Sequence, residues 1–274
     1  MNSNHTPSTS PGASTSGEPV IKALALQSGS NGNCIYVQAG GSHLFIDAGI
    51  SGIEAQRRLA VHGLQVPQNA ALLISHDHSD HTRGAGVFHR KFGFDLFMTR
   101  PTHDALQPGR LGKLRRVNFF GSGDTLHLND VQITTCPTPH DGVDGVCFVV
   151  EYRSRRLGIL TDLGHPFDGL EELICSLDGV FLESNYDMDM LLRGPYPYPL
   201  KKRIADPAGH LSNVESARLL KSGFAAGLKW AVLSHLSGEN NSPQVALATH
   251  RQIAGKDKPI YVARRDEVSA IFTL

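Results

Sequence analysis

Short apolar runs alternate with amphipathic segments from about residue 20 to the end of the chain. Runs with the length and residue types of β-strands cover 23–26, 34–38, 43–47, 71–74, 131–139, 157–161 and 230–234. Helical periodicity covers 53–62, 214–220 and 244–253. Because the two kinds of segment are intermixed and no internal repeat is present, the pattern predicts an α/β or α+β fold.

Three local signals predict where helices begin and end. Ser212 and Glu215 form the capping-box pattern that opens a helix. Ser242 followed by Pro243 predicts an N-cap and a first-turn proline. Gly223 is expected at the C-terminus of the helix that Ser212 opens.

The first residues of the chain have a different composition. Residues 1–19 are mostly Ser, Thr, Pro, Gly and Asn, so they predict a disordered tail. The remaining 20–274 are long enough for one large domain or two small ones, and one domain is the simpler interpretation. No basic stretch is followed by an apolar signal region, and no run of about 18 apolar residues is present. We therefore expect a cytoplasmic protein with no membrane partner.

The four cysteines are Cys34, Cys136, Cys147 and Cys175, and no two of them form a C-x-x-C pair. They lie in apolar or strand-like runs, which indicates buried free thiols in a reducing compartment. We do not assign them to a metal.

A dense group of metal-ligand residues follows the apolar run 71–74: His76, His78, Asp80 and His81. In extended backbone, residues two apart point to the same side, so His76 and His78 can bind one ion. A turn after them would let Asp80 and His81 face a second ion. Paired ions lie about 3.5 to 4 Å apart, which ligands from one tight segment can span.

Further candidate ligands lie at the ends of strand-like runs. His140 follows 131–139, Asp162 follows 157–161 and His235 follows 230–234. Each alone is as compatible with a hydrogen-bonded buried side chain as with a ligand. Together with the dense group, they become candidate ligands.

The order H-x-H-x-D-H, an isolated His, an Asp after a strand and a late His resembles the metallo-β-lactamase superfamily. The segment 45–49, with Asp47, is similar to the first Asp-x-Gly motif of that superfamily. The likeness runs from about residue 20 to the C-terminus and implies a four-layer αββα sandwich. Four further segments, 28–33, 183–187, 209–213 and 234–241, resemble the YycJ/WalJ-like group of bacterial exonucleases.

The resemblance implies a role for each candidate ligand. One ion would be held by His76, His78 and His140. The other would be held by Asp80, His81 and His235, with Asp162 bridging both. Asp77 would lie outside the ligand set. Asp47 would orient a ligand by hydrogen bonding, although a cap at a strand-to-helix turn is an equally good interpretation.

Two divalent ions in a cage of imidazoles and carboxylates indicate hydrolysis by a metal-activated water. The ligand set lacks thiolates and suits Zn²⁺ or Mn²⁺, with Fe²⁺ also compatible. We expect catalysis to depend on Asp80 and His210. His210 would protonate the leaving oxygen or bind phosphate, and its alternative role is to cap or pack beside the following helix.

A nucleic-acid substrate, DNA in particular, is implied by the resemblance. The Gly-rich loop with Ser30, Asn31 and Asn33 would offer substrate contacts, although a tight turn explains it equally well. Lys201 and Arg203 would contact the backbone near the stacking residues Tyr196 or Tyr198. The formal net charge is zero and the pI is about 7.3, so overall charge does not favour a nucleic acid.

The function expected from the resemblance is 5′-to-3′ DNA exonuclease activity at a dinuclear site. An RNA-processing nuclease, a cyclic phosphodiesterase and a thioester hydrolase of the same superfamily are the alternatives. A non-catalytic metal-binding module is the alternative from another class. The presence of His81 argues mildly against a lactamase, because many lactamases of this fold lack that histidine.

Overall fold

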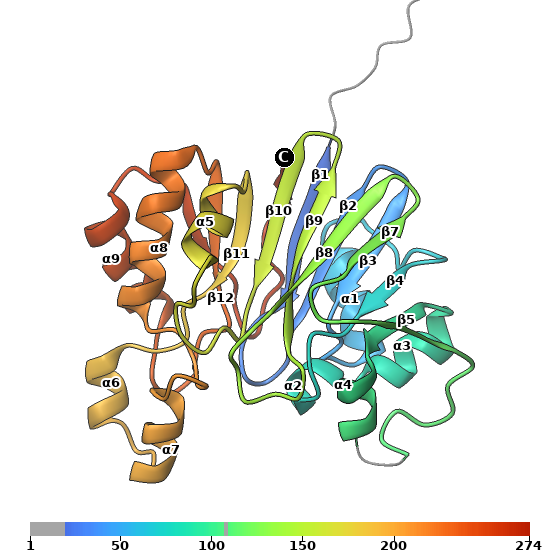
Figure 1. The fold of residues 1–274 in the computed structure, drawn as a ribbon, viewed down its shortest axis with the longest axis horizontal. Coiled ribbons are helices and arrows are strands. Elements are labelled where there is room, and N and C mark those ends of the chain that lie inside the picture. Colours follow the sequence, from blue (N-terminus) through green and yellow to red (C-terminus); the bar gives the residue numbers. More distant parts are fainter. Residues whose placement is uncertain (1–19, 107–108) are drawn as a thin grey trace, which may run out of the picture.

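The computed structural model describes residues 20–106 and 109–274. The predicted tail, 1–19, lies outside the described residues. Two mixed sheets pack face to face, each with seven strands in these ranges (Figure 1).

The first sheet has the strand order β14-β1-β2-β3-β4-β5-β6. Its strands are β1 (Ile21–Gln27), β2 (Cys34–Ala39), β3 (Ser42–Ile46), β4 (Ala71–Leu73), β5 (Asp95–Thr99), β6 (Val117–Phe120) and β14 (Phe272–Thr273). The second sheet has the order β13-β12-β11-β10-β9-β8-β7. Its strands are β7 (Thr125–Leu128), β8 (Val131–Pro137), β9 (Val146–Tyr152), β10 (Arg155–Leu160), β11 (Gly179–Glu183), β12 (Trp230–Ser234) and β13 (Ile260–Val262).

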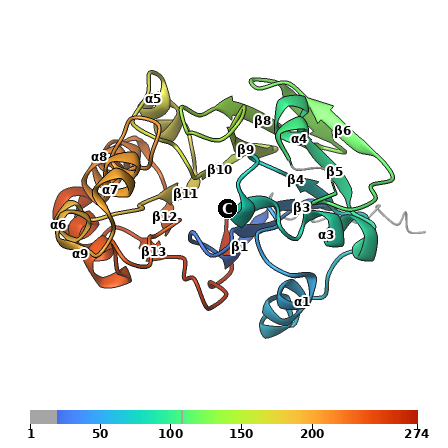
Figure 2. The same cartoon turned by 90° about the horizontal axis from the view of Figure 1, so that it is seen from below.

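Helices cover the outer faces of both sheets (Figure 2). The helices of the described residues are α1 (Gly52–Val61), α2 (Ser79–Thr82), α3 (Ala85–Phe92), α4 (Arg100–Ala105), α5 (Leu170–Cys175), α6 (Met188–Arg193), α7 (Tyr198–Ile204), α8 (Asn213–Ala226) and α9 (Pro243–Ala254). Of these, α1, α3, α5, α8 and α9 pack against the sheets. The runs expected to be strands or helices all lie at such elements, with ends that differ by a few residues. The prediction of intermixed strands and helices is therefore confirmed.

Three apolar cores separate the four layers. The inner faces of the two sheets share one core, in which Val37 and Leu73 of the first sheet lie with Phe148 and Val232 of the second. A second core packs the first sheet against α1 and α3. A third packs the second sheet against α5, α8 and α9. The predicted αββα sandwich is thus confirmed, and burial on both faces explains why the central strands are apolar throughout.

Two predicted helix starts are present, and one predicted helix end is wrong. Ser212 and Glu215 form the complete capping box of α8, and the Ser242 side chain accepts a hydrogen bond from the Val245 amide at the start of α9. Helix α8 continues past Gly223 and ends at Gly227, whose φ is 115°. Gly223 is instead a packing residue, because a Cβ there would lie 2.8 Å from Cγ2 of Ile174.

All four cysteines are free thiols. Cys34 and Cys147 are buried as expected, whereas Cys136 and Cys175 are only partly buried. Among the described residues, no helix combines the length and the apolar character that a membrane span requires.

Candidate metal centre

The candidate ligands gather at one edge of the sandwich because parallel strands end there together. In the first sheet, β3 and β4 are parallel neighbours and deliver Asp47 and His76. In the second sheet, β10, β11 and β12 are parallel and deliver Asp162, Glu183 and His235. The carboxyl edge of parallel strands is the usual place for a site in folds of this kind. Residues far apart in the sequence therefore meet.

Three of these strand-end residues have left-handed backbone. The φ angles are 62° at Asp47, 56° at Asp162 and 56° at His235. This conformation is uncommon for residues other than glycine, and it concentrates at functional sites because the surrounding structure must hold it in place. Here it turns the chain abruptly at the strand end.

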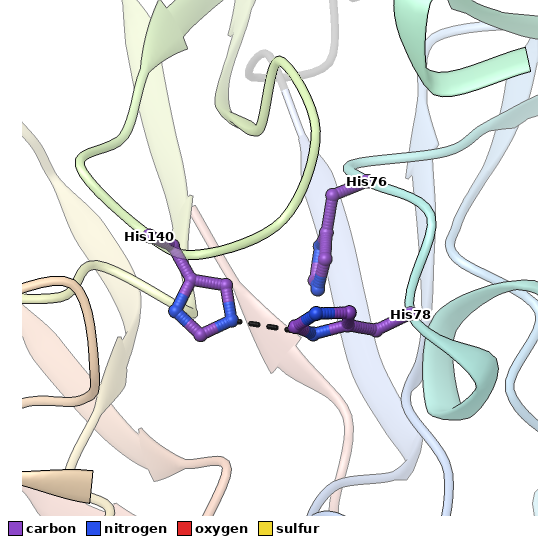
Figure 3. A group of neighbouring side chains, drawn as sticks. All are labelled: His76, His78 and His140. Atoms are coloured by element: carbon purple, nitrogen blue, oxygen red, sulfur yellow. Dashed lines mark hydrogen bonds between the residues drawn. The ribbon is translucent and has the colours of Figure 1, made fainter. Parts of the chain in front are cut away.

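His76, His78 and His140 form the first group (Figure 3). Each offers a ring nitrogen, and these atoms lie within 4.8 Å of one another. His140 Nδ1 donates to the carbonyl oxygen of Gly209 at 2.8 Å, which leaves Nε2 as the free nitrogen. That Nε2 lies 3.4 Å from Nδ1 of His78, so the two nitrogens face a common point.

Asp80, His81 and His235 form the second group. Asp80 Oδ2 lies 3.4 Å from His235 Nε2 and 3.6 Å from His81 Nε2. Asp162 lies between the two groups: its Oδ2 is 3.3 Å from His81 Nε2, and its Oδ1 is 3.6 Å from His140 Nε2. One carboxylate therefore reaches both sets of nitrogens.

Two buried atoms at the centre lack a partner. His76 Nε2 and Asp162 Oδ2 have no hydrogen bond to any residue that the structure describes. Buried polar atoms are normally satisfied, so such a pair requires an explanation. A divalent cation accepts lone pairs from both atom types, so these residues fit a metal site.

The electrostatics of the groups also suit a cation. Burial lowers the pKa of His76 well below its ordinary value, and His81 lowers it further, so this imidazole is neutral and able to ligate. Burial alone would lower the pKa of His81, but Asp162, Asp47 and Asp80 raise it to about 9. Burial would raise the pKa of Asp80, but His81 and His235 hold it well below its ordinary value. The carboxylates thus attract positive charge to the centre.

Comparison with known proteins agrees with this geometry. A family model described as the metallo-beta-lactamase superfamily matches residues 28–200. The chain is 34% identical to exodeoxyribonuclease WalJ of Streptococcus pneumoniae serotype 2 (strain D39) over 232 residues, covering 84% of this chain and 86% of that protein. The chain belongs to the metallo-β-lactamase superfamily.

Two further relatives extend the comparison. Exodeoxyribonuclease YycJ of Bacillus anthracis is 29% identical over 230 residues, covering 83% of this chain and 87% of that protein. The crystal structure of Zn²⁺-bound PqqB from Methylobacterium extorquens has the same fold, with a TM-score of 0.69 and 14% identity over 91% of this chain and 99% of that one. The metallo-β-lactamase architecture therefore extends across nearly the whole described chain.

Asp47 and Asp77 make different kinds of contact. In this metallo-β-lactamase fold, Asp47 Oδ2 lies 2.7 Å from Nδ1 of His81, and its Oδ1 accepts a hydrogen bond from the Ser75 amide at 2.8 Å. Asp77 accepts one from the Val143 amide at 2.8 Å. Asp47 thus contacts a candidate ligand, whereas Asp77 holds a neighbouring loop.

Glu183 is the residue that sequence reasoning missed as part of the site. Its fully buried carboxylate lies 2.7 Å from His210 Nδ1 and 3.3 Å from His235 Nδ1, and it accepts a hydrogen bond from the Leu163 amide at 2.9 Å. With Asp162, these residues form another group able to hold a metal ion. Glu183 closes a strand-like run just as Asp162 and His235 follow theirs, and the same criterion would have found it.

The candidate metal centre opens into a cavity of about 240 Å³. The predicted substrate contacts Ser30 and Arg203 line it, as do the predicted catalytic residues Asp80 and His210. Sequence reasoning also missed Asp141, whose only signal is that it follows His140. Asp141 lines the cavity and contacts Arg203, and Tyr196 lines the cavity as well.

The remaining predicted substrate contacts are engaged elsewhere. Asn33 is buried: its amide nitrogen donates to the Gly29 carbonyl oxygen at 3.1 Å and lies 3.1 Å from His81 Nε2. Asn31 is exposed and contacts Arg265. Lys201 donates to the carbonyl oxygen of Leu192 at 2.7 Å. Asn33 therefore supports the ligand segment itself, and neither Asn31 nor Lys201 lines the cavity.

Proposed function

We propose that this protein is a metal-dependent phosphodiester hydrolase that acts as a 5′-to-3′ DNA exonuclease. The observation that carries the proposal is the position of Asp162, whose carboxylate lies within 3.6 Å of ring nitrogens in both ligand groups. Relatives named exodeoxyribonuclease, similar over more than four fifths of the chain, support the choice of substrate.

The proposed ligands divide between two ions. His76, His78 and His140 would hold one, and Asp80, His81 and His235 would hold the other, with Asp162 contributing to both. Zn²⁺ and Mn²⁺ both suit this set of nitrogen and oxygen donors. When bound, such ions lower the pKa of water toward about 7 and offer positive charge to the phosphate.

Two side chains of the protein, His210 and Asp80, are expected to take part in the reaction. The carboxylate of Glu183 accepts a hydrogen bond from Nδ1–H of His210, which leaves His210 Nε2 free to face the cavity. When His210 carries a proton on both ring nitrogens, Nε2–H would donate its proton to the leaving oxygen of the phosphodiester, and the ring would return to the neutral form with Nδ1–H still bonded to Glu183. Asp80, between His81 and His235, is the other residue on which we expect catalysis to depend.

Ser30 and Arg203 are the proposed substrate contacts. Both line the cavity, and Arg203 brings a guanidinium group to a cavity that is otherwise rich in His and Asp. A guanidinium group binds phosphate oxygens through paired N–H donors.

The test is an end-resolved nuclease assay. Purified protein with Zn²⁺ or Mn²⁺ receives single- and double-stranded DNA labelled at either the 5′ or the 3′ end, together with circular DNA of the same sequence. We expect progressive release of nucleotides from the 5′ end and no cleavage of the circle. Equal cleavage of circular and linear DNA would contradict exonuclease action. Turnover of thioesters that excess DNA does not inhibit would point to the acyl-hydrolase alternative.

A further inference from the structure

Helix α7 (Tyr198–Ile204) occupies a position that core packing does not explain. None of its seven residues is buried. A helix this short has little stability alone, and most helices in proteins are held by an apolar face in a core. Its position here therefore depends on other contacts.

Polar contacts hold the C-terminal end of α7 at the metal centre. The His210 amide donates to the carbonyl oxygen of Ile204 at 3.0 Å, and the Asp141 amide donates to that of Ala208 at 3.0 Å. A Cβ at Gly209 would overlap the carbonyl oxygens of Arg203 and Ile204, so the chain passes unusually close to the helix. The end of α7 is thereby joined to two segments that carry site histidines.

One face of α7 lines the active-site cavity. Leu200, Arg203 and Ile204 are three and four residues apart, so they share a face of the helix, and Tyr196 lies just before the helix. The other wall of the cavity carries the candidate metal ligands. The cavity thus has one metal-ligand wall and one wall with an aromatic ring, aliphatic side chains and a guanidinium group.

Asp141 connects the two walls. Its Oδ2 accepts a hydrogen bond from Nε of Arg203 at 2.6 Å. Its Oδ1 lies 3.4 Å from Nε2 of His78 and 3.4 Å from Nε2 of His140. Among the described residues, the Arg203 side chain has no other hydrogen-bond partner, and it is 60% exposed. Asp141 therefore uses one N–H of Arg203 and leaves the terminal nitrogens free.

We propose that the cavity face of α7 recognises the terminal nucleotide of the substrate, with Arg203 as the phosphate contact and Asp141 as the residue that positions it. The ring of Tyr196 and the side chain of Leu200 contact the base of that nucleotide. This inference rests on the proposed nuclease function. A guanidinium group fixed at one nitrogen loses little further freedom on binding phosphate, and aromatic rings stack on any base.

The first test is a double-mutant cycle on the full-length, zinc-loaded protein with Arg203→Gln, Asp141→Asn and both together. With an end-labelled oligonucleotide, we expect Arg203→Gln to raise KM about tenfold while kcat stays within about twofold. Asp141→Asn should raise KM less, and the double variant should be no worse than Arg203→Gln. The zinc content should be the same in all four proteins.

Arg57→Gln is the matched control. Arg57 is exposed and paired with Glu54 at 3.0 Å, so this change also removes one paired surface cation, but on α1, which does not line the cavity. It should leave KM unchanged. An unchanged KM in Arg203→Gln, or fully additive effects in the double variant, would overturn the inference. So would loss of zinc from Asp141→Asn without a rise in KM, because Asp141 would then serve the metal alone.

A second test separates the base contact from the phosphate contact. Tyr196→Ala should raise KM for the oligonucleotide about tenfold, and Tyr196→Phe should restore it, because stacking needs the ring and not the hydroxyl. Inhibition by inorganic phosphate should weaken about tenfold in Arg203→Gln and stay unchanged in Tyr196→Ala. A phosphate inhibition constant that Arg203→Gln leaves unchanged would contradict the role of Arg203.

Failure of the nuclease function would look different. If the wild-type protein cut no nucleic acid, the proposed function would fall, and the zinc-loaded proteins could be compared by fluorescence anisotropy with the same oligonucleotide. Weaker binding by Arg203→Gln and Tyr196→Ala than by Arg57→Gln would then still support recognition by α7. Equal binding by all of them would overturn it.

Discussion

Asp47 Oδ2 lies 2.7 Å from Nδ1 of His81, with both side chains buried. A carboxylate can only accept here, so Nδ1 of His81 carries a proton, and Nε2 faces Asp162 at 3.3 Å. Asp47 follows β3 and His81 lies in α2, so this contact fixes a ring of one element from the end of another.

This contact predicts a specific effect of Asp47→Asn. An amide can present its NH₂ group to Nδ1 and favour the wrong tautomer, so we expect metal affinity to fall about 10- to 100-fold. Competition with a chromogenic chelator measures it. Asp77→Asn is the control, because Asp77 contacts the Val143 amide and none of the candidate ligands. Equal losses in both variants would indicate general loosening of the segment.

The two ligand groups predict about two metal equivalents per chain by elemental analysis. Asp80→Ala or His81→Ala should remove the second equivalent and reduce hydrolysis to less than about one hundredth of the wild-type rate, because both ions act on the same phosphate. The described fold should persist, as judged by far-UV circular dichroism. Full activity in either variant would exclude the assignment of the second ion.

His210→Ala should slow the chemical step without removing metal. Loss of a proton donor typically costs about 10²- to 10⁴-fold in rate, and we expect kcat to fall within that range. Metal content should remain at the wild-type value. If the variant lost an equivalent instead, His210 would be a ligand, in line with the group that it forms with Asp162, Glu183 and His235.

His250 predicts a pH dependence of stability away from the metal centre. It is buried in α9, with Nε2 3.1 Å from the hydroxyl oxygen of Ser216 in α8, and burial lowers its pKa from 6.5 to about 4. His250 in the unfolded chain therefore becomes protonated below about pH 6.5, whereas in the native protein it becomes protonated only near pH 4. This contribution to stability is present above pH 6.5 and is lost as pH falls toward 4.

Between pH 7 and pH 5, the free energy of unfolding should fall by about 2 kcal/mol through this residue. His250→Gln should remove that part of the slope in denaturant titrations, with the other pH-dependent groups common to both proteins. His127→Gln, at an exposed position of β7, should keep the wild-type slope. Parallel curves for wild type and His250→Gln would contradict the prediction.

The sequence predicted a structural feature correctly where that feature depends only on residues close together in the chain. The capping box needs only Ser212 and Glu215, and α8 begins where that pair indicates. The predicted end of α8 was wrong because Gly223 serves another purpose: it leaves room for Ile174 of a neighbouring helix. No local pattern can reveal that contact. Asn33 was predicted to contact substrate, and the structure places it 3.1 Å from His81. That contact depends on the fold, so no local pattern predicts it.

The sequence by itself determined the family and the candidate ligands, because His76, His78, Asp80 and His81 lie within one short segment with a specific spacing. Only the tertiary structure decided which side chains hold one another in place. Glu183 is 27 residues from His210, and Asp141 is 62 residues from Arg203. Such contacts form because the fold brings distant segments together where parallel strands end at a common edge. The number of residues between two side chains does not predict that they will be neighbours there.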